Sequence, residues 1–270
     1  MKKSIVVSTQ PTKFSALAFK EDFEKSIKKV AKLGFDGAEL AVRNPKDLKV
    51  NDVINIIKEN NLEVPAIGTG QAYGEEGLSF SDPDEVIRKM AVERINDQIV
   101  FASNFNAQVI IGLIRGEIEE SINRIEAEEW TIDCLKKCTE FAKEYNIRLT
   151  LEPVNRYESN FINTLNEGIE FIKRVGASNL GLLADTFHMN IEEVSIYGSI
   201  IQAKNYITHV HFADSNRWAP GCGHIDFKKV IETLKKIDYQ GYVSAEILPL
   251  PDPDSCARLT VETLNKLNIN

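Results

Sequence analysis

The chain has 270 residues, which is long for an ordinary single domain but normal for an α/β barrel of about 250 residues. Hydrophobic residues make up 43% and charged residues 27%, a globular balance, and no apolar run approaches the roughly 20 residues of a membrane helix. The net charge of −8 would repel a phosphate backbone and no basic stripe offsets it, so nucleic acid is not an expected partner.

The first residues, MKKSIVVST, hold an apolar stretch that is too short for a secretory signal. We therefore expect a cytoplasmic protein that makes no membrane contact. No linker rich in Pro, Gly or Ser divides the chain, so the simplest interpretation is a single domain over residues 1–270.

Short apolar segments rich in β-branched residues predict eight strands. They lie at 3–9, 36–42, 62–69, 107–114, 148–152, 180–185, 207–212 and 241–247. Apolar residues at helical spacing follow each of them, which predicts eight helices. Gly34 and Gly176 are positioned to end two of these helices, and Thr164 with Glu167 forms a capping box at the start of another.

Alternating strands and helices imply parallel pairing with right-handed crossovers. No G-x-G-x-x-G motif follows the first strand, so closure into a (β/α)8 TIM barrel is favoured over an open dinucleotide-binding sheet. The longest connections, residues 68–84 and 115–130, follow the third and fourth strands. Barrel enzymes keep lids and specificity loops at such places.

Four potential metal ligands each stand at the end of a different predicted strand. They are Glu152, Asp185, His211 and Glu246, in the segments RLTLE, LGLLAD, ITHVHF and GYVSAE. Each alone could be a helix cap or a core histidine, but four on successive strands are hard to explain in that way. Three carboxylates and an imidazole suit Mn²⁺, Co²⁺, Mg²⁺ or Zn²⁺ and would repel one another without a cation.

Two histidines lie two positions apart on the seventh predicted strand, so both side chains point to the same face, the barrel interior. We assign His211 to the metal. His209 is expected to be a buried, hydrogen-bonded residue one layer deeper.

Three longer segments carry a family resemblance. LEPVNRYE (151–158), LADTFHMNIEE (183–193) and HVHFADSNRWAPGCGHIDF (209–227) are similar to the signatures of the D-tagatose 3-epimerase and D-psicose 3-epimerase family, within the xylose-isomerase-like barrels. Weaker similarity, including GFDGAEL (34–40), extends over nearly the whole chain.

The resemblance implies a sugar epimerase that binds one divalent metal ion, most often Mn²⁺ or Co²⁺, through the four strand-end residues. It implies that Glu152 and Glu246 act as the acid and base on the two faces of a metal-stabilised enediolate. Glu158, His188 and Arg217 would hold the oxygens at the C1 end of a ketose. The family commonly forms dimers or tetramers, so a homo-oligomer is expected.

Arg115 follows the fourth predicted strand, where its charge could meet an anionic group of a substrate. A phosphorylated or carboxylated substrate therefore stays open. Against it, the loop after the eighth strand reads LPLPDPD and lacks the glycines of a barrel phosphate site. An unphosphorylated ketose is favoured.

Other functions remain open at the level of sequence. Hydroxypyruvate or inosose isomerases share the metal set. A metal-dependent endonuclease of related fold would need a histidine-rich cluster and a basic groove, and the chain has only four histidines. A glycosidase could use Glu152 and Glu246 without a metal, and a sugar-binding barrel would bind without proton exchange.

Overall fold

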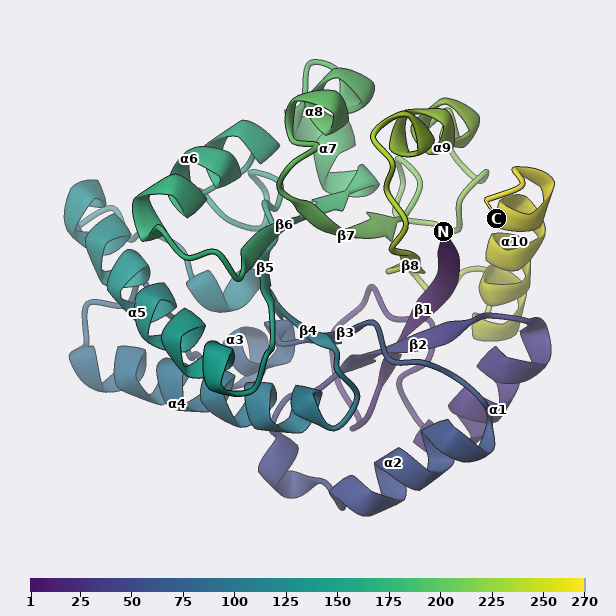
Figure 1. Ribbon diagram of the computed structural model, residues 1–270, viewed down its shortest axis with the longest axis horizontal. Coiled ribbons are helices and arrows are strands. Elements are labelled where there is room, and N and C mark those ends of the chain that lie inside the picture. The colour runs from purple at the N-terminus through teal and green to yellow at the C-terminus, as the bar shows by residue number, and fades with distance from the viewer. Residues whose placement is uncertain (270) are drawn as a thin grey trace.

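The computed structural model describes residues 1–269 and forms one closed barrel of parallel strands inside a ring of helices (Figure 1). Each strand pairs with its neighbour in sequence, and β8 closes the barrel onto β1. The predicted (β/α)8 TIM barrel is confirmed. The eight strands are β1 (Lys2–Ser8), β2 (Gly37–Ala41), β3 (Ala66–Gly68), β4 (Gln108–Ile111), β5 (Leu149–Leu151), β6 (Leu180–Asp185), β7 (Ile207–Phe212) and β8 (Tyr242–Ala245).

Residues 1–269 contain ten α-helices, two more than the sequence predicts. They are α1 (Phe23–Leu33), α2 (Val50–Glu59), α3 (Gly70–Glu76), α4 (Glu85–Ser103), α5 (Arg124–Glu144), α6 (Leu165–Val175), α7 (Thr186–Glu192), α8 (Ile196–Gln202), α9 (Phe227–Lys236) and α10 (Pro253–Lys266). Short 3₁₀ turns, η1 (Pro45–Asp47) and η2 (Leu113–Arg115), follow β2 and β4. The extra helices arise because α3 folds inside the connection after β3, and because β6 is followed by two short helices.

The predicted helix ends are present. The Thr164 hydroxyl and the Glu167 side chain form a reciprocal capping box at the start of α6. Gly34 and Gly176 end α1 and α6 in the left-handed conformation, with φ of 88° and 74°. Glycine adopts this conformation without the steric penalty of a Cβ atom.

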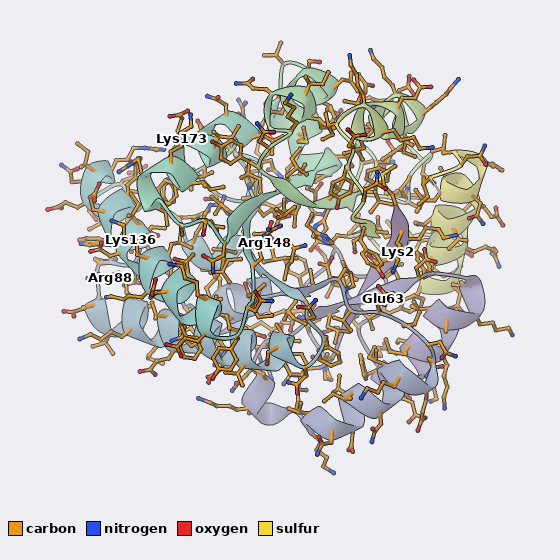
Figure 2. All side chains as sticks on the ribbon, in the orientation of Figure 1. Lys2, Glu63, Arg88, Lys136, Arg148 and Lys173 are labelled. Carbon is orange, nitrogen blue, oxygen red and sulfur yellow. The ribbon has the colours of Figure 1, made fainter. Side chains whose placement is uncertain are left out.

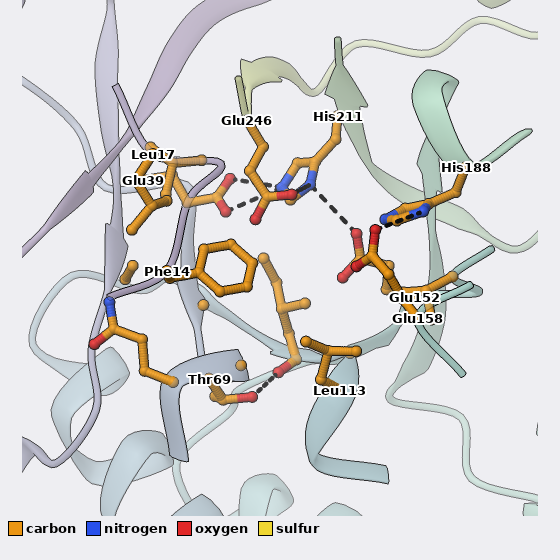
Figure 3. A pocket seen from close by; sticks show the side chains of 18 of the residues that line it. Phe14, Leu17, Glu39, Thr69, Leu113, Glu152, Glu158, His188, His211 and Glu246 are labelled. Atoms are coloured by element: carbon orange, nitrogen blue, oxygen red, sulfur yellow. Dashed lines mark hydrogen bonds and ion pairs between the residues drawn. The ribbon is translucent and has the colours of Figure 1, made fainter. Parts of the chain in front are cut away.

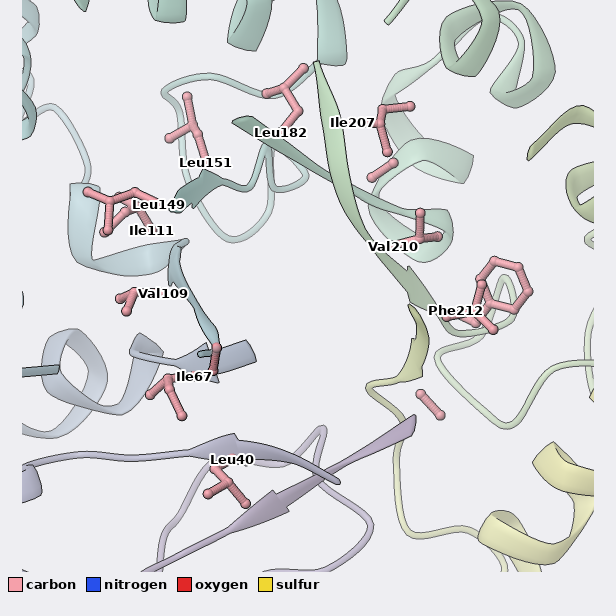
Figure 4. Close-up of a cluster of buried hydrophobic side chains, with 14 of the residues drawn as sticks. Leu40, Ile67, Val109, Ile111, Leu149, Leu151, Leu182, Ile207, Val210 and Phe212 are labelled. Atoms are coloured by element: carbon pink, nitrogen blue, oxygen red, sulfur yellow. The ribbon is translucent and has the colours of Figure 1, made fainter. Parts of the chain in front are cut away.

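The main core lies between the barrel and the helices, because alternate strand residues point outward (Figure 4). Its strand residues include Leu40, Ile67, Val109, Ile111, Leu149, Leu151, Leu182 and Val210. A smaller cluster of Ala66, Ile110 and Leu183 is separate from it. Ile110 and Ile111 are neighbours in sequence and belong to different clusters, as the alternation of a barrel strand requires.

Charged side chains cover the outside of the helices, and Lys2 lies beside Glu63 at 2.6 Å near the start of β1 (Figure 2). The first and last described residues also meet, since the amino group of Met1 donates to the carbonyl of Ile269 at 3.2 Å. Among residues 1–269, no helix has the length and apolar character needed to cross a membrane.

Candidate metal centre and active site

The four strand-end residues meet at one point. Glu152 follows β5, Asp185 ends β6, His211 is the penultimate residue of β7 and Glu246 follows β8. Each contributes one ligand atom, and these four atoms lie within 4.8 Å of one another. Parallel pairing produces this convergence, because neighbouring parallel strands end at the same rim of the barrel.

The His211 Nδ1 atom lies at the centre of the group. It is 3.4 Å from Glu152 Oε1, 3.6 Å from Asp185 Oδ2 and 3.8 Å from Glu246 Oε2. Three of these atoms, His211 Nδ1, Glu152 Oε1 and Asp185 Oδ2, are buried and have no hydrogen-bond partner. Unpartnered buried polar atoms are rare in folded proteins, and oxygen and imidazole atoms arranged around one point fit a divalent cation.

The two carboxylate oxygens of Asp185 have different roles. Oδ1 accepts hydrogen bonds from the backbone N–H groups of Phe187 at 2.7 Å and His188 at 3.3 Å, which caps α7. Oδ2 remains free toward His211. The carboxylate is therefore held rigidly by a helix cap while its second oxygen stays available as a ligand.

Protons compensate the crowded negative charge in the metal-free protein. Burial is the largest cause that raises the pKa of Glu246 to about 8, and the carboxylates of Glu152 and Asp185 add to it against the opposing charge of Arg217. Burial would lower the pKa of His211, but Glu39, Asp185 and Glu152 hold it well above its usual range. A bound dication would take the place of these protons.

The three predicted substrate-binding residues lie beside the four candidate metal ligands. Arg217 Nη1 is 3.4 Å from Glu158 Oε1 and 3.2 Å from His188 Nε2, and Arg217 Nη2 donates to Glu246. The guanidinium also stacks on the Phe187 ring, 4.7 Å from its centroid. Arg217 is itself in the left-handed conformation with φ of 61°, which tight packing around the site maintains.

The protonation pattern of His188 follows from a backbone contact. The N–H of Asn155 donates to His188 Nδ1 at 3.1 Å, so this nitrogen is an acceptor. In a neutral imidazole the proton is then on Nε2, which lies 3.9 Å from Asp185 Oδ2. Because a guanidinium can only donate, the 3.2 Å approach of Arg217 Nη1 to this protonated nitrogen is not a hydrogen bond. Burial lowers the pKa of His188, which favours this neutral form.

The candidate metal ligands Glu152, His211 and Glu246 and the predicted substrate-binding residues line one pocket. Opposite them, its wall is mostly apolar (Figure 3). Phe14 and Leu17, from the segment that joins β1 to α1, face Leu113 of η2 across it. The remaining apolar side chains that line it are Val6, Ala41, Ile110 and Val154. The pocket thus has a charged end at the four candidate metal ligands, and the rest of its lining is mostly apolar with the uncharged polar side chains of Thr69 and Gln71.

The sequence left open that Arg115 meets an anionic group of a substrate, but its side chain does not face the pocket. It is fully buried, and its guanidinium donates to the backbone carbonyls of Gly112, Glu152, Phe161 and Ile162 at 2.9–3.1 Å. All of the hydrogen bonds found for it go to backbone oxygens. Arg115 therefore fixes the chain around Glu152 and is not placed to recognise an anionic substrate.

Sequence reasoning did not identify Glu39 as a functional residue. This carboxylate comes from the middle of β2, is 1% exposed and contacts both His209 and His211. His209 is buried and hydrogen-bonded to it, as predicted. The available signal was a charged residue in the centre of an otherwise apolar strand.

Comparison with known proteins identifies a matching family model, related sequences and a similar crystal structure. A family model described as xylose isomerase-like TIM barrel matches residues 27–266. A D-psicose 3-epimerase of Ruminiclostridium cellulolyticum is 34% identical over 83% of this chain and 78% of its own. An L-ribulose 3-epimerase of Mesorhizobium japonicum is 30% identical over 86% and 78%. The crystal structure of D-psicose 3-epimerase with D-tagatose from Clostridium cellulolyticum H10 superposes with a TM-score of 0.85 at 27% identity, over 99% of both chains.

Proposed function

Because this chain belongs to the xylose isomerase-like TIM barrel family, we propose that it is a metal-dependent epimerase that inverts C3 of an unphosphorylated ketose. The sequence motifs of the chain resemble those of 3-epimerases, and the matching relatives are named D-psicose and L-ribulose 3-epimerases. The observation that carries the proposal is the convergence of Glu152, Asp185, His211 and Glu246 within 4.8 Å.

Glu152 and Glu246 are the proposed acid and base. Inversion at C3 requires one group to remove a weakly acidic proton next to the ketone and another to return a proton to the opposite face. The two glutamates enter the pocket from β5 and β8, which two other strands separate.

The four converging residues would hold one divalent ion, for which we propose Mn²⁺, with Co²⁺, Mg²⁺ or Zn²⁺ as alternatives. An oxygen-rich set with one imidazole supports this choice. When bound, such an ion supplies Lewis-acid stabilisation of the negative charge that develops on a substrate oxygen.

Glu158, His188 and Arg217 are proposed to bind the oxygens at the C1 end of the ketose. The Nε2–H of His188 and the guanidinium of Arg217 can donate hydrogen bonds, and Glu158 can accept one from a hydroxyl. Arg217 is held in place by its contacts with the carboxylates of Glu158 and Glu246.

A neutral sugar fits the pocket better than a phosphorylated or carboxylated one. Arg217 is the single lysine or arginine among the pocket-lining residues, and it already pairs with Glu246 and Glu158. The distal wall of Phe14, Leu17 and Leu113 offers no charge to an anionic group, which would have to be desolvated without a partner.

The cellular location and assembly also remain proposals. Four free cysteines, three of them buried, support a reducing compartment such as the cytoplasm. A dimer or tetramer is proposed from the family resemblance, and light scattering of the purified protein measures it.

Solvent exchange tests the epimerase function. We expect the Mn²⁺-loaded protein to exchange the C3 proton of tagatose, fructose or psicose for deuterium in D₂O, with formation of the C3 epimer. The panel should include hydroxypyruvate, an inosose and a phosphorylated ketose. Exchange with one of these three and none with the free ketoses would assign another substrate, and no exchange with any divalent metal would exclude the epimerase.

The acid–base pair is tested by Glu152→Gln and Glu246→Gln. Each variant keeps an amide oxygen near the metal but cannot carry the proton, so kcat should fall by about 10²–10⁴-fold. Metal content is measured in parallel, to separate loss of proton transfer from loss of the ion. Glu170→Gln, at an exposed position on α6, is the matched control and should leave kcat unchanged. Near-normal kcat in either site variant contradicts its role.

A further inference from the structure

Glu39 connects opposite parts of the barrel beneath the metal ligands. From β2, its carboxylate reaches β7, where Oε2 is 2.7 Å from His209 Nε2. Its Oε1 is 3.0 Å from His211 Nε2 (Figure 3). All three side chains are 1% exposed. The barrel interior therefore holds one acid in contact with two imidazoles, one of which, His211, also belongs to the proposed ion site.

The contact with Glu39 determines which nitrogen of His211 is free. An ionised carboxylate can only accept hydrogen bonds, so the Nε2 atom that faces it carries a proton. In the neutral ring, Nδ1 then keeps its lone pair, and Nδ1 is the atom that faces Glu152, Asp185 and Glu246. The opposite tautomer would place a lone pair against a carboxylate and an N–H toward the ion.

We propose that Glu39 is a positioning residue for the metal centre: it holds His211 in the tautomer and orientation that direct Nδ1 to the ion, and His209 fixes the Glu39 carboxylate in turn. This inference rests on the proposed metal role of His211. Hydrogen bonds of this kind orient a ligand and increase its basicity.

A second ion bound by Glu39, His209 and His211 is the competing interpretation, because their ligand atoms also lie within 4.8 Å of one another. The nitrogen–oxygen distances of 2.7–3.2 Å are those of direct N–H···O hydrogen bonds. Each imidazole Nε2 thus has its partner already, whereas Nδ1 of His211 has none. The ion is therefore assigned to the Nδ1 side.

The experiment compares Mn²⁺ affinity and metal stoichiometry in the wild type, Glu39→Gln and His209→Gln, by competition with a chelator. An amide in place of the Glu39 carboxylate presents an N–H₂ group to one of the two imidazole N–H groups. Affinity in Glu39→Gln should fall about 10–100-fold. His209→Gln retains the bond between Glu39 and His211 and supplies an amide N–H for the other, so its affinity should stay within about threefold of the wild type.

Ring ¹⁵N NMR of the Zn²⁺-loaded wild type gives a second readout that needs no variant. We expect His211 to carry its proton on Nε2 and to bind the ion through Nδ1. The reverse assignment, two ions per chain, unchanged affinity in Glu39→Gln, or an equal loss in His209→Gln would each overturn the proposal. If the wild type takes up no divalent ion, the metal-dependent function itself fails. Unchanged affinity in Glu39→Gln with tight wild-type binding removes only the role of Glu39.

Discussion

At the scale of single residues, Arg115 shows a buried charge that serves the backbone. Its guanidinium binds the carbonyl of Glu152 and that of Ile162, a β-branched residue in the left-handed conformation with φ of 60°. Such a conformation is unfavourable for isoleucine and persists only where surrounding contacts enforce it. Burial lowers the pKa of Arg115 to about 10, so it remains charged at neutral pH.

Replacing Arg115 with methionine should destabilise the protein strongly. The change removes the guanidinium donor from four buried carbonyls. The Gly112 carbonyl still accepts from the backbone N–H of residue 115 and the Phe161 carbonyl from the Ser159 hydroxyl, while each group left unsatisfied costs about 1–3 kcal/mol before relaxation. We expect a loss of about 3–5 kcal/mol in the free energy of unfolding, measured in urea. The control is Arg258→Met, an exposed arginine with one hydrogen bond to Ser255, where the change should stay within about 0.5 kcal/mol. Equal effects of the two substitutions would contradict the structural role.

The raised pKa of Glu246 leads to a prediction of how metal binding depends on pH. Its pKa of about 8 in the metal-free protein means that the group is mostly protonated at pH 7 and must lose its proton to bind a cation. His211, whose pKa is also raised, must lose one as well. Uptake of one ion at pH 7 should therefore release roughly one to two protons, and affinity should rise as pH increases through 8.

Isothermal titration calorimetry in buffers of different ionisation enthalpy measures this release. Glu246→Gln is the matched control, because it removes one titrating group and should release about one proton fewer. Metal binding that releases no proton at pH 7, or affinity that falls as pH rises, would show that the site is already deprotonated.

The limits of sequence reasoning at this scale follow from long-range contacts. Glu152, Asp185, His211 and Glu246 could be predicted because each directly marks a strand end, and strand ends are local features. The role of Glu39 depends on a contact with β7 across 172 positions of sequence, which no local pattern contains. Arg115 was ambiguous for the same reason, since its partners near 161 and 162 lie in a distant loop.

At the scale of elements, two helical glycines show that packing determines whether alanine, the better helix former, would stabilise the protein. A Cβ atom on Gly168 of α6 would stand 2.7 Å from Leu182 and 3.3 Å from Pro153. A Cβ on Gly198 of α8 would meet only Ser195, at an ordinary 3.4 Å. The first glycine allows α6 to approach the barrel closely, whereas the second has room for a methyl group.

The two alanine substitutions should therefore change the free energy of unfolding in opposite directions. Gly198→Ala should raise the free energy of unfolding by about 0.5–1 kcal/mol, the usual gain for alanine over glycine in a helix. Gly168→Ala has the same gain available but should be destabilising overall, because overpacking costs about 1–3 kcal/mol. Thermal unfolding of both variants beside the wild type measures this. A stabilised Gly168→Ala variant would mean that the close approach of α6 is easily relaxed.

The positions of β1 and β7, which carry β-branched residues, and of β6, a short apolar run, could be predicted well. Residues 62–69 were expected to be one strand, but β3 covers only Ala66–Gly68, with Ile67 and Gly68 paired to β2 and Ala66 and Ile67 paired to β4. Pro65 lacks an N–H and so begins no ladder at its own position. Helix α3 was missed because its GQAYGEE sequence is rich in glycine, and its stability comes from packing against η2.

At the scale of the whole molecule, the closed barrel predicts one cooperative unit, as expected for a single domain over residues 1–270. Trp130 lies on α5, and Trp218 lies in the connection between β7 and α9. We expect the single-tryptophan variants Trp130→Phe and Trp218→Phe, both metal-free, to show the same urea midpoint by fluorescence and by circular dichroism. Two separate midpoints would show that the halves of the barrel unfold independently.

The contact between Met1 and Ile269 has a practical consequence for re-engineering the chain. Both residues lie at the rim where strand β1 begins, and Lys3 strengthens the junction with a 2.8 Å hydrogen bond to Asn265. The pocket opens at the other rim, where the strands end. A short peptide could therefore join the two ends into a circular permutant, and a tag, a fused domain or a solid support attached at either end would leave the substrate entrance clear.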